Sequence, residues 1–159
     1  MDNKGKQLQQ LTSDSADNRR PSWHPSGRKI LFESNRNGAQ ELFTINIKNR
    51  KEKKVAAPLK MGEWMFASFS PNGKHIAASV QISENNSHII LLNKRGKFIQ
   101  KLVENDLRNY YPKWSSDDKE IVYFSRKDTD NKDDEIYRLN IETGALHKPS
   151  LTAMEQLMP

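Results

Sequence analysis

A segment of 17 residues occurs three times along this chain, and this repeat restricts the fold more than any other feature of the sequence. The copies read NRRPSWHPSGRKILFES from residue 18, WMFASFSPNGKHIAASV from residue 64 and NYYPKWSSDDKEIVYFS from residue 109. When they are aligned, Trp23 matches Phe69 and Trp114, at steps of 46 and 45 residues. Periods of this length are typical of arrays in which each repeat is one supersecondary unit.

Each copy continues in the same way, with a polar turn, a third strand-like run and a short fourth run. The third runs are LFTINI, HIILLN and EIYRLN, and the fourth runs are KKVAA, FIQKLV and ALHKPSL. Alternation of apolar with polar residues and enrichment in β-branched and aromatic residues indicate strands. The sequence therefore predicts an all-β fold built of β-propeller blades, with three four-stranded antiparallel sheets in a single segment over residues 1–159.

The blades are expected at approximately 13–57, 58–104 and 105–152, with an extra outer strand over 6–12 that has no blade of its own. Known propellers have about 4 to 8 blades. Three blades leave three interpretations open: part of a longer ring, half of a six-bladed ring that a homodimer completes, or a stable open monomer. An open fan of blades would expose two apolar sheet faces, and such faces usually associate.

The residues of the inner hairpin of each blade have expected roles in packing and in the turn. The aromatic residue of the repeat, Trp23 in the first copy, should pack one sheet on the next. Gly27 and Gly73 fit a turn position with positive φ, and Asp118 is a tolerated substitute there. His24 should hydrogen-bond backbone in this turn rather than act as a catalytic base.

The pattern P-x-W-[HS]-P-x-G-[RK]-x-I resembles the WD-repeat-like blade of the TolB family, and the stretch from Leu11 to Ile47 is similar to one such repeat. The second copy has Ala67 in place of the motif proline, and the third has SSDD in place of S-P-D-G. The resemblance implies a non-catalytic binding or scaffold module. It also implies that the protein acts in the bacterial periplasm, within envelope complexes, and binds a peptidoglycan-associated lipoprotein.

The loops that lead into the innermost strands should line the mouth of the central channel. They are Ser15–Arg20, Gly62–Phe66 and Leu107–Tyr111, and they are rich in arginine and large aromatic residues, the types favoured at binding hot spots. We expect an anionic or aromatic-rich segment of a protein or peptide partner to bind at this mouth. The residues expected to contact it are Asn18, Arg19, Arg20, Trp64, Arg108 and Tyr110.

Composition narrows the function further. The 26 Lys and Arg residues against 20 Asp and Glu give a net charge of +6, which favours anionic partners in general. The basic run at 48–54 has no interleaved aromatic residue, so nucleic acid is not indicated. Cysteine is absent, and the acidic turn at 128–135 lacks the spacing of a calcium loop, so no metal or other cofactor is expected.

No apolar run approaches the roughly 20 residues of a membrane span, and the polar beginning of the chain is no signal peptide. A periplasmic location is expected if the chain is a mature or truncated segment, and a cytoplasmic one if Met1 is the native start. Two enzymatic alternatives stay open: the propeller portion of a serine peptidase of the prolyl-oligopeptidase kind, and a metal-dependent propeller hydrolase. No G-x-S-x-G motif occurs, so we expect no catalytic residue in this chain.

Overall fold

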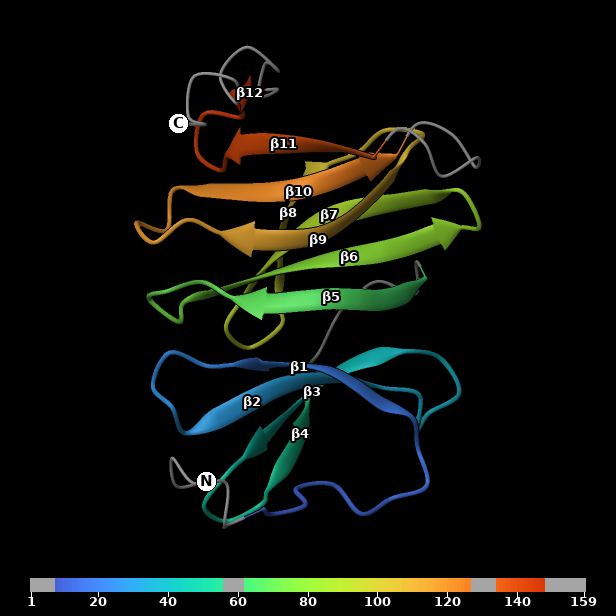
Figure 1. Ribbon diagram of the computed structural model, residues 1–159, viewed down its shortest axis with the longest axis vertical. Coiled ribbons are helices and arrows are strands. Elements are labelled where there is room, and N and C mark those ends of the chain that lie inside the picture. The colour runs from blue at the N-terminus through green and yellow to red at the C-terminus, as the bar shows by residue number, and fades with distance from the viewer. Residues whose placement is uncertain (1–7, 56–61, 127–133, 148–159) are drawn as a thin grey trace, which may run out of the picture.

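The computed structural model describes residues 8–55, 62–126 and 134–147, and the regular elements in these ranges are twelve β-strands (Figure 1). The first sheet consists of β1 (Asn18–Trp23), β2 (Lys29–Ser34), β3 (Glu41–Asn46) and β4 (Glu52–Lys54). The second consists of β5 (Glu63–Phe69), β6 (His75–Ser83), β7 (Asn86–Asn93) and β8 (Phe98–Val103). The third consists of β9 (Arg108–Trp114), β10 (Glu120–Arg126), β11 (Asp134–Asn140) and β12 (Leu146–His147).

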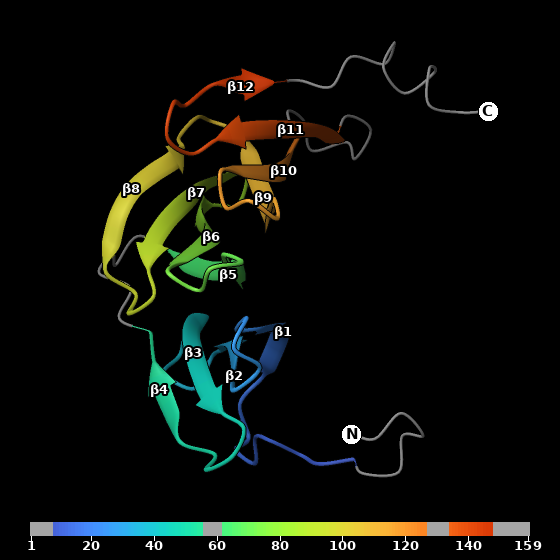
Figure 2. The same ribbon diagram turned by 90° about the vertical axis from the view of Figure 1, so that its left-hand side faces the viewer.

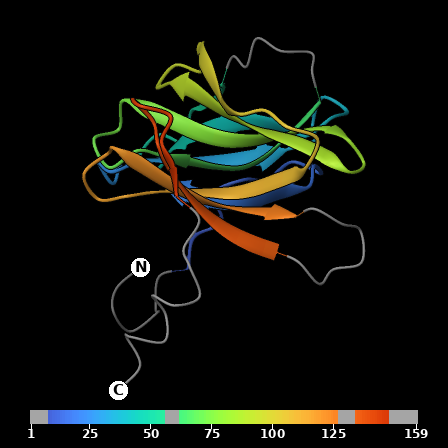
Figure 3. The same cartoon turned by 90° about the horizontal axis from the view of Figure 1, so that it is seen from above.

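The three sheets are stacked face to face in chain order, with β1, β5 and β9 on one side of the stack and β4 and β8 on the other (Figure 2). Seen from above, the sheets overlie one another (Figure 3). Pairing within each sheet is antiparallel, and a single parallel pairing of Ser87 with Arg108 joins the second sheet to the third. The predicted all-β fold of repeated four-stranded propeller blades is confirmed.

The turn between the first two strands has the same backbone conformation in each sheet. Gly27, Gly73 and Asp118 have φ angles of 66°, 68° and 64°, so the expected left-handed position is confirmed. The N–H of each donates to the carbonyl oxygen three residues earlier, at 2.9, 2.8 and 3.3 Å. The ring of His24 accepts a hydrogen bond from the backbone N–H of Ser26 at 3.1 Å, which is the turn role expected for it.

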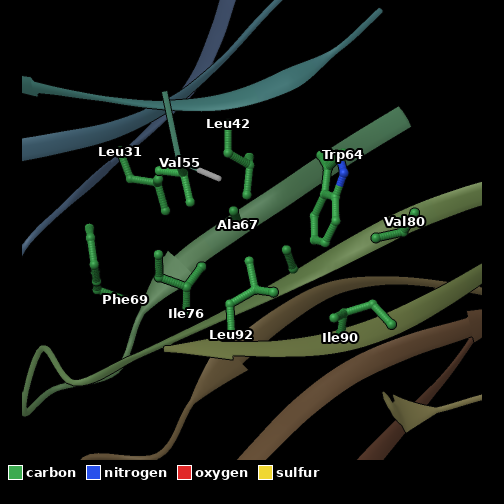
Figure 4. Packing of buried hydrophobic residues seen from close by; sticks show 11 residues of the cluster. Leu31, Leu42, Val55, Trp64, Ala67, Phe69, Ile76, Val80, Ile90 and Leu92 are labelled. Atoms are coloured by element: carbon green, nitrogen blue, oxygen red, sulfur yellow. The ribbon is translucent and has the colours of Figure 1, made fainter. Parts of the chain in front are cut away.

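Two apolar clusters hold the sheets together. The cluster between the first and second sheets is shown in Figure 4 and contains Leu31, Leu42, Val55, Trp64, Ala67, Phe69, Ile76, Ala78, Val80, Ile90 and Leu92. The cluster between the second and third sheets contains Ala77, Ile89, Val103, Ile121, Tyr123 and Leu139. Because strand residues alternate between the two faces of a sheet, the second sheet contributes one set of side chains to each cluster.

The aromatic residue of the repeat packs as expected in two copies of three. Phe69 is 8% exposed within the first cluster. Trp114 is half-buried against the second cluster, and its indole N–H donates to the carbonyl oxygen of Ser68 at 3.2 Å. Trp23 is 62% exposed, so the prediction that it packs between blades is wrong. This position faces the preceding sheet, and no sheet precedes β1 in the described chain.

The extra outer strand expected over 6–12 is not formed in its described part, because residues 8–13 are in no strand. Leu8 is 86% exposed, whereas Leu11 packs on the free face of the first sheet, against a small cluster of Phe32, Phe43 and Ile45. The outer edge of this sheet is formed by β4, which pairs with β3.

Candidate binding site at the channel mouth

Each innermost strand, β1, β5 and β9, contains a bulge at the same point of the repeat. The pairing with the second strand shifts register around Arg20, Phe66 and Tyr111. These residues lie in the left-handed region, with φ of 47°, 55° and 58°. This conformation costs a non-glycine residue about 1–2 kcal/mol. Such bulges redirect a side chain and are common beside functional sites, so this shared strain marks the inner edge of the stack as a candidate site.

The three bulge residues form a continuous column across the three sheets. The guanidinium carbon of Arg20 lies 4.1 Å from the centre of the Phe66 ring. The ring centres of Phe66 and Tyr111 are 3.7 Å apart, with 39° between their planes. Tyr111 is 43% exposed at the end of this bulge column, so the column presents an aromatic face to solvent.

A buried carboxyl fixes the first half of the bulge column. Glu33 is fully buried, and its Oε2 accepts a hydrogen bond from Nη1 of Arg20 at 2.5 Å. Its Oε1 accepts from the backbone N–H of Phe66, also at 2.5 Å. Burial raises the pKa of Glu33, while the hydrogen bonds from Arg20 and Phe66 work in the opposite direction. One side chain of the first sheet therefore positions the bulge residues of two sheets.

A pocket of about 250 Å³ lies beside the bulge column, between the second and third sheets. The middle of β5, the end of β6, the start of β7, the first residues of β9 and the end of β10 enclose it. The described residues that line it are Met65, Phe66, Gln81, Ser83, Glu84, Asn86, Ser87, Arg108, Tyr110, Tyr111 and Arg126. The lining thus combines aromatic faces with guanidinium, amide and hydroxyl groups and the carboxylate of Glu84, which are binding groups for a polypeptide.

The two arginines of this pocket differ in their partners. The guanidinium of Arg126 pairs with Asp134 at 2.5 and 2.6 Å and lowers the pKa of that carboxyl. The hydroxyl of Tyr110 donates to the same carboxylate at 2.7 Å. Burial and this hydrogen bond raise the pKa of Tyr110 to about 12. The half-buried side chain of Arg108 also helps to lower the pKa of Asp134, but it has no hydrogen bond or ion pair with any residue that the structure describes, so its N–H groups are available to a ligand.

The structure brings together three of the six residues expected to bind a partner. Arg108 and Tyr110 line the pocket, and Arg20 begins the bulge column. Trp64 does not belong to the mouth, because it is 3% exposed in the cluster between the first two sheets. Its cross-strand partner is Val80, so the strand alternation turns its ring toward the first sheet.

The other two expected residues make local contacts. The amide of Asn18 donates to Asp14 at 2.7 Å, and Nε of Arg19 donates to Asp17 at 2.5 Å. Both acceptors lie in the loop before β1, so these side chains hold the loop rather than line the pocket. Arg19 is exposed.

From the sequence, Glu33 was considered only as a possible catalytic acid and rejected, so its positioning role was missed. Arg126 was missed entirely, and the bulge column was not recognised as one feature. The alignment could have indicated the bulge column, because Arg20, Phe66 and Tyr111 occupy the same position of the repeat. Nothing in the sequence alone indicated that this position would be left-handed. Most of the acidic turn at 128–135 lies outside the described residues. Among the described residues, no three His, Asp or Glu side chains gather to hold a metal ion, and no helix could span a membrane.

No family model matches this chain, and no curated protein sequence does either. Solved structures do match. TolB from Acinetobacter baumannii aligns with a TM-score of 0.76 and 17% identity over 92% of this chain and 35% of that one. The chain has the fold of a TolB-type β-propeller. At this identity the likeness shows the fold alone.

Two further structures show how widely this blade is used. A putative TolB from Agrobacterium tumefaciens aligns with a TM-score of 0.71 and 15% identity, over 87% of this chain and 50% of that one. The acylaminoacyl peptidase of Pyrococcus horikoshii aligns with a TM-score of 0.58 and 13% identity, over 86% and 26%. The chain thus spans between about a third and a half of the length of the two TolB structures.

Proposed function

We propose that this chain is a non-catalytic binding module whose channel mouth holds an extended segment of a protein or peptide partner. The observation that carries the proposal is Arg108, a half-buried cation in a preformed pocket that makes no hydrogen bond or ion pair with a described residue. A guanidinium without such bonds can form a bidentate, charge-assisted pair with an incoming carboxylate. The neighbouring ring of Tyr111 supplies rigid apolar contact area.

The chemistry of the pocket defines the partner. A carboxylate of the bound segment pairs with Arg108, and an apolar or aromatic side chain packs on Tyr111 and Phe66. Backbone groups of the segment bond the polar side chains of Gln81 and Asn86. By the resemblance to TolB we propose an envelope lipoprotein as a partner of this kind and the periplasm as the location.

Selection of phage-displayed random peptides on the purified chain tests the proposal. Selected peptides should carry an acidic group beside an aromatic residue, and should bind Arg108→Ala or Tyr111→Ala at least about tenfold more weakly, a loss of about 1.4 kcal/mol. Arg95→Ala is the matched control, because Arg95 is an exposed arginine in the β7–β8 turn at the opposite end of the blade. Peptides that bind all three variants equally well would exclude this mouth as the site.

A second candidate function is the propeller portion of a serine peptidase. The likeness to the Pyrococcus horikoshii peptidase, and to prolyl endopeptidases at a TM-score of 0.63, favours it. In that role the mouth would pass substrate peptides toward a hydrolase domain. The encoding gene decides between the two roles, because the peptidase role requires an α/β-hydrolase sequence in the same reading frame.

A further inference from the structure

The two faces of each sheet in the stack pack against different neighbouring sheets. One face packs on the preceding sheet through the aromatic residue of the repeat, and the other receives the next sheet. Between the first two sheets, Phe69 packs in one cluster with Leu31 and Leu42. Between the second and third sheets, Trp114 packs against the second cluster in the same way. The chain therefore shows the same interface twice.

The face of the first sheet that would pack on a preceding sheet leaves its aromatic residue open. Trp23 pairs with Ile30, as Phe69 pairs with Ile76 in the second sheet. It thus occupies the packing position but is 62% exposed. A tryptophan at this exposure is the residue type that dominates the energy of protein interfaces.

The receiving face of the third sheet has a matching hollow. It measures about 300 Å³ and is lined by Tyr111, Lys113, Val122, Tyr123, Phe124 and Ile136. Val122 and Ile136 are 41% and 47% exposed. Val122 stands where the first sheet has Leu31, and Ile136 pairs with Phe124 as Leu42 pairs with Glu33. The hollow is thus the counterpart of the surface that Phe69 covers within the chain.

We propose that two copies of this chain associate head to tail, with Trp23 of each copy seated in the Val122–Ile136 hollow of the other. Each of the two contacts repeats the interface already present between neighbouring sheets. The pair is closed, because both open faces of both copies are used and none is left to recruit a third copy. On the first sheet Phe32, Phe43 and Ile45 are already buried beside Leu11, so Trp23 supplies the exposed apolar contact of this face. Exposed apolar residues such as Trp23, Val122 and Ile136 are a recognised mark of association.

Sedimentation of the wild-type chain should show a species of two copies. Trp23→Asp and Val122→Asp each damage both contacts of the pair, so each should weaken association at least about tenfold. Ile99→Asp is the matched control, because Ile99 is 43% exposed on β8, away from both faces, and this variant should pair as the wild type does. A wild type that stays monomeric at high concentration overturns the proposal.

A mixing experiment separates head-to-tail pairing from other modes and guards against misfolded variants. Trp23→Asp retains an intact hollow, and Val122→Asp retains an intact Trp23. An equimolar mixture can therefore form one undamaged contact, and association should return in part although each variant alone is monomeric. Folded variants that stay monomeric when mixed, or a wild type that forms longer open polymers, would contradict the closed head-to-tail pair.

Discussion

The backbone N–H of Phe66 donates to the buried carboxyl of Glu33 at 2.5 Å, and this bond ties the second sheet to the first at the strained position of the repeat. The other oxygen of Glu33 accepts from Arg20, the strained residue of the first sheet. The amide of a left-handed bulge residue cannot pair in the regular ladder, so a side chain supplies its acceptor. The shape of the mouth therefore depends on a carboxyl of the neighbouring sheet.

Glu33→Gln should remove the fall in the free energy of unfolding that occurs as pH rises through the folded pKa of Glu33. Burial raises the pKa of Glu33 above its ordinary 4.5, so the folded chain retains this proton to higher pH than the unfolded chain does. The Glu33 contribution to the free energy of unfolding is therefore largest below pH 4.5 and falls as pH rises through the folded pKa. Urea denaturation of wild type and variant across this range measures the difference, and parallel profiles would contradict it.

Glu41→Gln should remove a contribution to the free energy of unfolding that rises with pH, the opposite of the Glu33 contribution. Burial acts to raise the pKa of Glu41, but hydrogen bonds from Lys54 and Asn37 outweigh it and lower the pKa below 4.5. The contribution of Glu41 is thus fully present above pH 4.5 and lost as pH falls through the folded pKa. Wild type and Glu41→Gln should converge at acid pH, and profiles that stay parallel across the range would show that the pair with Lys54 adds nothing.

Trp114→Ala and Trp23→Ala should differ sharply although they change the same position of the repeat. Trp114 packs on the second cluster and donates to Ser68, so its loss should cost about 3 kcal/mol. Trp23 is 62% exposed, so its loss should cost less than about 0.5 kcal/mol. Chemical denaturation at low protein concentration, where association contributes little, compares them. Equal losses would show that Trp23 packs within its own chain.

The fold could be predicted because its determinants are local and repeated. Three copies of one turn, with Gly27, Gly73 and Asp118 in the left-handed region, fix the inner hairpins, and alternation fixes the strands. The exposure of Trp23 could not be read from its own segment, because the burial of this residue depends on a sheet that the described chain does not place before it.

The site was only partly predictable for a related reason. Trp64 and Tyr110 both belong to segments that lead into an innermost strand, so the sequence predicted that both would face the channel mouth. A strand sends neighbouring side chains to opposite faces, and the bulge one or two residues later changes that alternation. Trp64 therefore lies in the core while Tyr110 lines the pocket. The bulge depends on pairing between strands and on the acceptor that Glu33 provides, which a single segment does not reveal.

Gly73→Ala should destabilise the chain more than Gly27→Ala, although both glycines hold the same turn position with φ of 68° and 66°. A Cβ at Gly27 would meet nothing within 4 Å, so that variant should lose only the left-handed backbone cost of about 1–2 kcal/mol. A Cβ at Gly73 would lie 2.9 Å from the His24 ring and 3.1 Å from Pro25, in the turn of the first sheet. Either the His24 ring swings away and gives up its edge contact with Phe69, or the two turns move apart, which should cost about 1 kcal/mol more. Urea midpoints of the two variants give the comparison, and equal midpoints would mean that these turns do not press on each other in solution.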